Sequence, residues 1–294
     1  MKNVLKQSGK ALCYFLTYLI CQVIATIGSM MVFGFIEGIK VASQGEAIDQ
    51  AAVTEQVADQ VMGNLGIVLV LNAILALGIY FIVTKIRKHK FTEEVSIKKV
   101  SVKTLLLTLL ASIGSIGFLN FGMDLIPFPE DLVDAMVEGN AEISGLPFWQ
   151  SLLVTAILVP ITEEIVFRGF VFSRLDKAMP TAVAVIITSI LFGVIHGSVL
   201  WAFWAGLTGA VFNIVRVQTG SLIPSIIMHM LNNSCSLVLS NFDTDFLDKF
   251  TPFIAIAGGV LLVTSIFLMV RDRKNREALE QEDRVEVEVR TVEV

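Results

Sequence analysis

The sequence predicts an all-α, polytopic integral membrane protein with about eight transmembrane helices and both termini in the cytoplasm. Of its 294 residues, 54% are hydrophobic and only 17% are charged, whereas about a quarter of a soluble domain is charged. Several apolar segments reach the roughly 20 residues that a helix needs to cross a bilayer. Basic and acidic loops also alternate along the chain, as expected for loops on opposite faces of a membrane.

Eight apolar segments are long enough to be candidate spans: 11–36, 65–84, 103–122, 148–172, 181–198, 200–216, 221–240 and 252–270. Pro160 interrupts the fourth. The fifth and sixth are joined by almost nothing, which predicts a tight helical hairpin. The sixth segment is short, and the sequence leaves open whether it crosses the membrane fully.

The charges of the loops support this number of spans. Lysine and arginine gather at the N-terminus, in the second loop, after the fourth and sixth segments, and in the tail. The intervening loops, 37–59, 124–142 and 243–248, are mostly acidic. Basic loops favour the cytoplasm. Eight spans place almost every basic residue on the cytoplasmic side, whereas seven spans would place half of them on the opposite side. The first segment is too long for a signal peptide, so we expect an uncleaved span.

Three charged residues lie within six positions of the apolar fourth segment: Glu163, Glu164 and Arg168. Each charge at a helix centre costs about 2.5–3.5 kcal/mol on insertion scales. These side chains must therefore face a protein interior rather than lipid. Such a cluster indicates either a functional site or an ion-pair network that holds helices together.

Helical spacing distinguishes the two glutamates. Glu164 and Arg168 are four residues apart, share a face and can neutralise each other. Glu163 lies about 100° round the helix and has no partner in its own segment. An unpaired carboxylate in a low dielectric is held ready to take a proton, which a general base for activating water requires. Pro160, one turn earlier, frees a backbone carbonyl and favours a kink.

Two later apolar segments each carry a histidine. Phe192 and His196 share a face in the fifth, and His229 and Asn233 share a face in the seventh. A lone histidine in such a segment is more often a packed hydrogen-bonding residue than a catalyst. His229 and Asn233 could, however, direct two donors at one point, which suits a developing oxyanion. Together the three segments predict a buried polar site built from three helices.

These motifs resemble the CAAX protease and bacteriocin-processing family of intramembrane proteases, also called CPBP or Abi. The family pattern Glu-Glu-x-x-x-Arg is matched by Glu163, Glu164 and Arg168. Its Phe-x-x-x-His is matched by Phe192 and His196, and its His-x-x-x-Asn or Asp by His229 and Asn233. The resemblance covers roughly residues 148–240, and no motif position is missing.

The resemblance implies roles for these residues. Glu163 and His196 would activate water, and His229 and Asn233 would polarise the scissile carbonyl. Glu164, Arg168 and Phe192 would support them. The expected protein is an intramembrane endopeptidase that acts on a peptide or lipidated protein in a bacterial plasma membrane. It divides into N-terminal spans (1–147), a protease core (148–240), and a last span with a charged tail (241–294).

Two other function classes stay open. One is a non-catalytic membrane protein that binds a peptide or partner, such as an immunity or scaffold protein. The other is a small transporter with a buried proton relay, although the paired discontinuous helices and inverted repeat expected of one are missing. No nucleic-acid motif is present, and the basic second loop suits the headgroups of anionic membrane lipids.

A metal site is the remaining alternative for the chemistry. Glu163, His196 and His229 could supply two histidines and a carboxylate to zinc. The sequence has no His-Glu-x-x-His, and the nearby Arg168 disfavours a dication. The family is usually described as metal-independent, so we expect no cofactor and no metal. The three cysteines, Cys13, Cys21 and Cys235, lack metal-binding or redox spacing.

Overall fold

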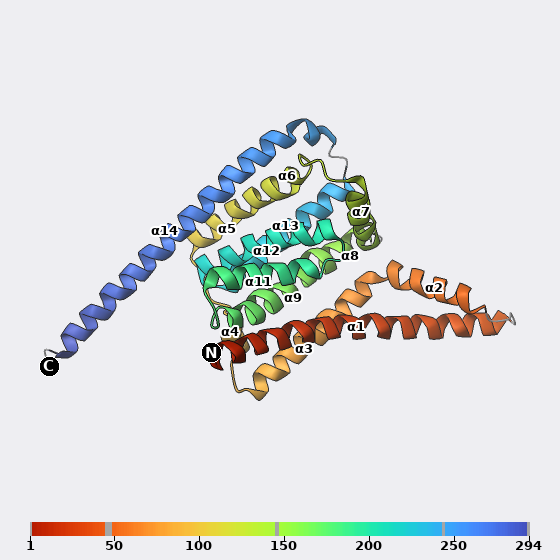
Figure 1. The fold of residues 1–294 in the computed structure, drawn as a ribbon, viewed down its shortest axis with the longest axis horizontal. Coiled ribbons are helices and arrows are strands. Elements are labelled where there is room, and N and C mark those ends of the chain that lie inside the picture. Colours follow the sequence, from red (N-terminus) through yellow and green to blue (C-terminus); the bar gives the residue numbers. More distant parts are fainter. Residues whose placement is uncertain (1, 45–48, 145–146, 243–244, 293–294) are drawn as a thin grey trace.

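The computed structural model describes residues 2–44, 49–144, 147–242 and 245–292. Within these ranges every regular element is helical and no strand occurs (Figure 1). Labels η1 to η3 mark π-helical turns and η4 a 3₁₀ helix. The elements are α1 (Lys2–Gln44), α2 (Gln50–Gly63), α3 (Leu65–Ile86), α4 (Phe91–Glu94), α5 (Val102–Ser115), η1 (Ile116–Asn120), α6 (Phe121–Met123), α7 (Glu130–Ser144), α8 (Phe148–Leu153), η2 (Val154–Leu158), α9 (Val159–Glu164), η3 (Ile165–Val171), α10 (Phe172–Leu175), α11 (Thr181–Val194), α12 (Val199–Thr219), α13 (Leu222–Asn241), η4 (Asp245–Phe250) and α14 (Thr251–Val292).

The chain is a multi-pass helical membrane protein. Seven helical stretches of the described residues are long and apolar enough to cross a bilayer: Lys2–Gln44, Leu65–Ile86, Val102–Met123, Phe148–Leu175, Val199–Thr219, Leu222–Asn241 and Phe246–Leu279. The shorter apolar helix α11 coincides with the remaining predicted segment. Each of the eight predicted segments therefore has a helical counterpart.

The lengths of the fifth and sixth segments differ from expectation. The sixth, α12, has 21 residues and is long enough to span. The fifth, α11, has only 14, or about 21 Å at 1.5 Å per residue, against a hydrocarbon core of about 30 Å. The sequence was misleading because apolar residues continue past Val194 to Ile195, where the helix has already ended. Two predicted acidic loops also contain helices, α2 and α7.

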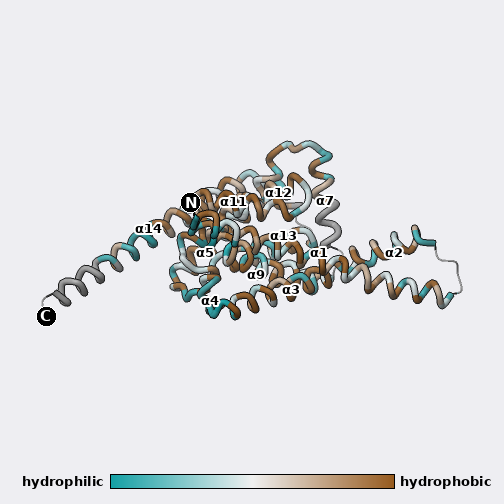
Figure 2. The backbone as a smooth tube through the Cα atoms, turned by 60° about the horizontal axis from the view of Figure 1, so that its bottom comes forward, coloured by the Kyte–Doolittle hydropathy of each residue, from teal (hydrophilic) through white to brown (hydrophobic). Residues whose placement is uncertain are grey.

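The helices form a bundle with a central group and two flanks. The motif stretch α8–α10 lies with α11, α12 and α13 at the centre of Figure 1, between α1 and α3 on one side and α5 and α14 on the other. Hydrophobic colour follows most of the central helices and the inner half of α14 in Figure 2. The motif helix is therefore enclosed by other helices, as its charges require.

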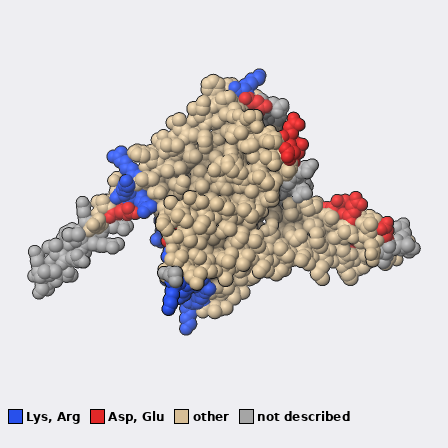
Figure 3. Space-filling view, in the orientation of Figure 1, with Lys and Arg blue, Asp and Glu red and all other residues tan. Residues whose placement is uncertain are grey.

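Charge separates along the long direction of the bundle. Lysine and arginine gather towards one end of the visible face in Figure 3, and most acidic residues towards the other. The chain also begins and leaves at the basic end (Figure 1). Which membrane face meets the basic end stays a prediction.

An aromatic cluster fixes the first helix against the motif helix. The ring of Phe170 lies 4.8 Å from that of Tyr14 and 4.9 Å from that of Tyr80, measured between centroids. Tyr18 contacts Phe167 at 5.8 Å. Tyr80 also donates a 2.7 Å hydrogen bond to the carbonyl of Tyr14. These contacts hold α1 and α3 beside the charged motif.

The predicted hairpin of α11 and α12 is tight because glycine lines the contact. A Cβ atom on Gly193 would collide with the backbone carbonyl of Ala202 and lie 3.3 Å from the amide nitrogen of Gly206. Gly197 adopts φ +87° in the connecting turn, a conformation that glycine adopts without strain. The side chain of Ser198 then caps α12 by accepting from the amide of Trp201.

Candidate active site

The motif helix is wound irregularly around Pro160. The π-helical turn η2 precedes α9, and η3 follows it. In η2 the amide of Val159 bonds to the carbonyl of Val154, five residues back. The next amide in that series would be residue 160, which is proline and has none. Asn233 supplies the missing donor, because its Nδ2 bonds to the carbonyl of Thr155 at 2.9 Å. Turns of this kind often occur at functional sites.

Arg168 lies at the centre of the site and is fully buried. Its Nη1 donates to Glu164 Oε1 at 2.8 Å, and its Nη2 donates to the carbonyl of Gly209 at 2.9 Å. The guanidinium carbon also lies 4.2 Å from the centre of the Phe192 ring, a favourable cation–π contact. The predicted pair of Glu164 and Arg168 is therefore present, and Phe192 supports it as expected.

Gly209 makes room for this arrangement. A Cβ atom there would lie 2.8 Å from Arg168 Nη2 and 2.9 Å from Cδ1 of Phe192. The sequence analysis did not single out Gly209, and one glycine of α12 is not distinguishable from its neighbours without the structure. Its contacts make it the point at which α12 receives the charged cluster.

His229 lies between the two glutamates. Its Nδ1 is 3.0 Å from Glu164 Oε1, and its Nε2 is 3.7 Å from Glu163 Oε2. The residue is buried, and its ring packs 5.0 Å from that of Phe212 and 5.7 Å from that of Phe192. With Nδ1 as the donor to Glu164, Nε2 is directed at Glu163.

His196 approaches from the turn after α11. Its Nδ1 lies 2.8 Å from the carbonyl of Phe192. A carbonyl only accepts hydrogen bonds, so Nδ1 carries the proton and Nε2 is left as the acceptor. The ring contacts those of Phe192 at 4.8 Å and Trp201 at 5.6 Å, and it interacts electrostatically with Glu163. The shortness of α11 thus brings His196 to the depth of the motif helix.

Glu163 has partners that the sequence analysis missed. The side chain of the buried Tyr18, from α1, interacts electrostatically with Glu163 and lies near Asn72 of α3. Tyr14 and Tyr18 are four residues apart, so two tyrosines share one face of an apolar helix. That spacing was the available indication that α1 contributes polar groups to the bundle interior.

Comparison with known proteins follows this geometry. Residues 145–235 match the family described as type II CAAX prenyl endopeptidase Rce1-like. This range contains all seven motif residues. This part of the chain resembles the CAAX protease family.

One curated relative is similar to part of the chain. It is the protein named "Putative membrane peptidase YdiL" of Bacillus subtilis (strain 168), 26% identical over 88 residues. The alignment covers 30% of this chain and 36% of that protein. No solved structure matches the chain. The CAAX protease match supports membrane protease activity at the level of the family.

Within the described residues, the structure brings most predicted site residues together. Glu163, Glu164, Arg168 and His229 form one network, and Phe192 joins it to His196. Asn233 lies on the same helix as His229, but one of its amide hydrogens is used by Thr155. Among the residues that the structure describes, no group of three His, Cys, Asp or Glu side chains is arranged to hold a metal ion.

Proposed function

We propose that this protein is an intramembrane endopeptidase in which Glu163 and His196 activate a water molecule. The observation that carries the proposal is the inequality of two adjacent carboxylates. Glu164 is held by direct contacts with Arg168 and His229, whereas Glu163 has no direct contact with an arginine among the described residues and interacts with Arg168 only electrostatically. A carboxylate without a directly bound cation is the better proton acceptor, so Glu163 is the one proposed to take a proton.

The proposed reaction begins with water between Glu163 and the free Nε2 of His196. Glu163 takes one proton as the water oxygen bonds to the carbonyl carbon of the scissile peptide. The resulting tetrahedral intermediate carries its negative charge on the former carbonyl oxygen. The proton on Glu163 then passes to the leaving nitrogen, the C–N bond breaks, and the products are a carboxylate and an amine.

His229 and Asn233 are proposed to stabilise the oxyanion. A protonated His229 has a second N–H at Nε2, and Asn233 has a second amide hydrogen beyond the one that Thr155 accepts. Donors held in a buried site cost little reorganisation when the charge develops. Arg168 and Glu164 would act by positioning His229 rather than by touching the substrate.

We further propose a prenylated or otherwise lipidated peptide as the substrate, in a bacterial plasma membrane. The family description names prenyl endopeptidases, and a site enclosed by apolar helices favours a peptide that partitions into lipid. The direct test is cleavage of a farnesylated peptide by purified protein in lipid nanodiscs, with products identified by mass. In H₂¹⁸O the new carboxylate should gain one heavy oxygen.

In the same cleavage assay, the wild-type protein is compared with the Glu163→Gln variant. Loss of cleavage with normal accumulation supports the proposal. Cleavage at the wild-type rate rejects Glu163 as the base. If a cellular phenotype survives in Glu163→Gln while cleavage is lost, a non-catalytic immunity or scaffold role explains that phenotype instead. Comparing the lengths of membrane peptides in wild-type and Glu163→Ala cells would identify the natural substrate.

A further inference from the structure

The protein contains a second buried arginine cluster, away from the motif residues. Three arginines are buried: Arg168, Arg174 and Arg216. Arg168 is paired with Glu164, and Arg174 is paired with Glu94. Arg216 is 8% exposed, yet it forms no hydrogen bond or ion pair with any residue that the structure describes, and its Nε is both buried and unsatisfied.

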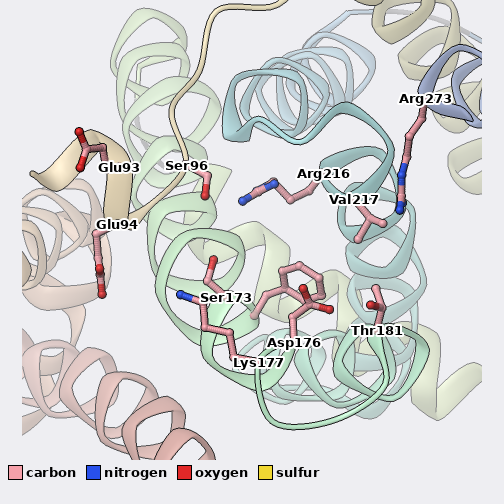
Figure 4. A pocket seen from close by; sticks show the side chains of 11 residues that line it. Glu93, Glu94, Ser96, Ser173, Asp176, Lys177, Thr181, Arg216, Val217 and Arg273 are labelled. Carbon is pink, nitrogen blue, oxygen red and sulfur yellow. The ribbon is translucent and has the colours of Figure 1, made fainter. Parts of the chain in front are cut away.

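Arg216 faces a cavity of about 420 Å³. It lies in the last turn of α12. Figure 4 shows its side chain extending towards Ser96 and Ser173, with Lys177 beside Ser173 and Arg273 on the opposite wall. All five residues line the cavity. The pocket is therefore rich in N–H and O–H donors.

The wall that contains Ser96 is held in an unusual conformation. Ser96 has φ +58°, which costs a residue other than glycine free energy. Its carbonyl accepts from the amide of Leu222 at 3.0 Å, and Lys98 and Ser221 exchange two further hydrogen bonds between the same segments. The start of α13 thus fixes Ser96 at the edge of the pocket.

The acidic residues of the pocket do not neutralise Arg216. Glu94 is bound by Arg174, and Glu93 pairs with Lys90 at 3.1 Å. Asp176 is exposed at the rim and forms no ion pair with Arg216. Asp176 and Glu164 act on Arg216 electrostatically but without a direct contact. A buried cation without a directly bound partner is costly, so the pocket favours an anion. The carboxylates at the rim disfavour a dianion, which leaves a singly charged ligand as the best fit.

We propose that this pocket binds the phosphodiester of a phospholipid headgroup, with Arg216 as its principal ligand. A guanidinium fork suits two phosphate oxygens at once. Ser96, Ser173 and Lys177 offer further donors. The basic end of a membrane bundle is also where headgroup phosphates lie. Inorganic phosphate shares the chemistry but is partly a dianion at neutral pH, whereas a phosphodiester carries one charge.

The test measures the thermal midpoint of the full-length protein in neutral detergent. The probes are dioctanoyl phosphatidylglycerol, dioctanoylglycerol, which lacks the phosphate, and sodium phosphate at matched ionic strength. Phosphatidylglycerol should raise the wild-type midpoint saturably, and the other two should raise it much less. Arg216→Gln should lose this rise while its lipid-free midpoint equals or exceeds that of wild type.

Two further variants sharpen the result. Lys99→Gln removes one exposed charge from the same end and should keep the full rise. Arg216→Lys keeps the charge without the fork and should bind several-fold more weakly. A full rise in Arg216→Gln, or an equal rise with dioctanoylglycerol, would overturn the site. An equal rise with sodium phosphate would overturn the lipid as its source.

Discussion

Arg168 and Arg216 are both buried arginines on helices of the same bundle, but their surroundings are opposite. Arg168 has a carboxylate, a backbone carbonyl and an aromatic ring around its guanidinium. Arg216 has an open cavity. Burial of an arginine alone therefore does not identify a ligand site. A charge whose partners are all within the protein organises its neighbours, and a charge without partners leaves room for a ligand.

The same distinction separates neighbouring carboxylates. Glu164 forms an ion pair with Arg168, whereas the neighbouring Glu163 does not. In the second region, Glu94 is paired by Arg174 and Asp176 is not. Substitutions of matched residues around Arg168 and around Arg216 test this distinction.

The largest effect is expected for Glu163→Gln. Gln keeps the shape of the side chain but removes the base, so cleavage should fall by about 10²–10⁴-fold, a typical contribution of general acid–base catalysis. Accumulation in the membrane should stay normal. Asp176→Asn makes the same chemical change at the Arg216 pocket and should leave cleavage near the wild-type rate. Equal losses in both variants would reject the distinction between the two regions.

Replacing the two arginines should have very different effects on stability. Arg168→Ala leaves Glu164 without its cation, and breaking a buried pair from one side costs about 3–5 kcal/mol. Arg216→Ala breaks no pair and should cost far less. Membrane yield and thermal midpoint measure both. The double variant Glu164→Gln with Arg168→Met should recover accumulation, but it need not recover cleavage.

If Arg168→Ala is as abundant and stable as wild type yet inactive, Arg168 acts on the substrate or transition state. The double variant provides the check on the electrostatic reason. Failure to recover accumulation would indicate that the hydrogen bond to Gly209 or the Phe192 contact matters more than the pairing with Glu164.

His196→Ala and His229→Ala should each reduce cleavage by about 10²–10³-fold, the usual cost of a lost transition-state donor. The third histidine, His89, is exposed and pairs with Glu94 at the basic end. His89→Ala is therefore the matched control and should cleave normally. Chelators should not reduce activity. Stoichiometric zinc, with activity lost on its removal and restored on its return, would overturn the metal-free mechanism.

Local spacing explains which features were predictable from the sequence. The apolar segments and the Glu164–Arg168 pair depend on residues close in sequence. All eight segments contain a helix, seven of these helices are long enough to span, and the pair is present. The interaction of Tyr18 with Glu163 joins residues far apart in the chain, and no pattern in either segment specifies the other. The end of α11 was misplaced because hydrophobicity does not distinguish a helix from the apolar turn that follows it.

A smaller effect is expected at Gly209. Gly209→Ala places a methyl group 2.8 Å from Arg168 Nη2, and overpacking of this kind costs about 1–3 kcal/mol. Gly206 lies on the same helix, where the nearest atom to an added Cβ would be the Ser189 carbonyl oxygen at 3.4 Å. Gly206→Ala should be neutral or slightly stabilising, since alanine is the better helix former. Similar thermal midpoints for both variants would show that the cluster tolerates displacement.

Asn233 has a structural role and a proposed catalytic role, and the two can be separated. Asn233→Ala leaves the Thr155 carbonyl without a donor, at a cost of about 1–3 kcal/mol for an unsatisfied buried group. Pro160→Ala restores an amide five residues after Thr155, which can donate to the same carbonyl. In that background, Asn233→Ala should therefore cost less stability than in wild type. A double-mutant cycle on thermal midpoints measures this coupling.

The cycle contains wild type, Asn233→Ala, Pro160→Ala and the double variant. Measuring cleavage by these four proteins gives the second readout. If Asn233 also stabilises the oxyanion, Pro160→Ala will restore the stability of Asn233→Ala but not its activity. Recovery of both would show that Asn233 acts only by holding α13 against η2. Additive changes in midpoint would contradict the assignment of Asn233 as the replacement for the missing amide. Pro160 removes a backbone donor and Asn233 replaces it, so the effects of the two residues on stability are expected to be coupled.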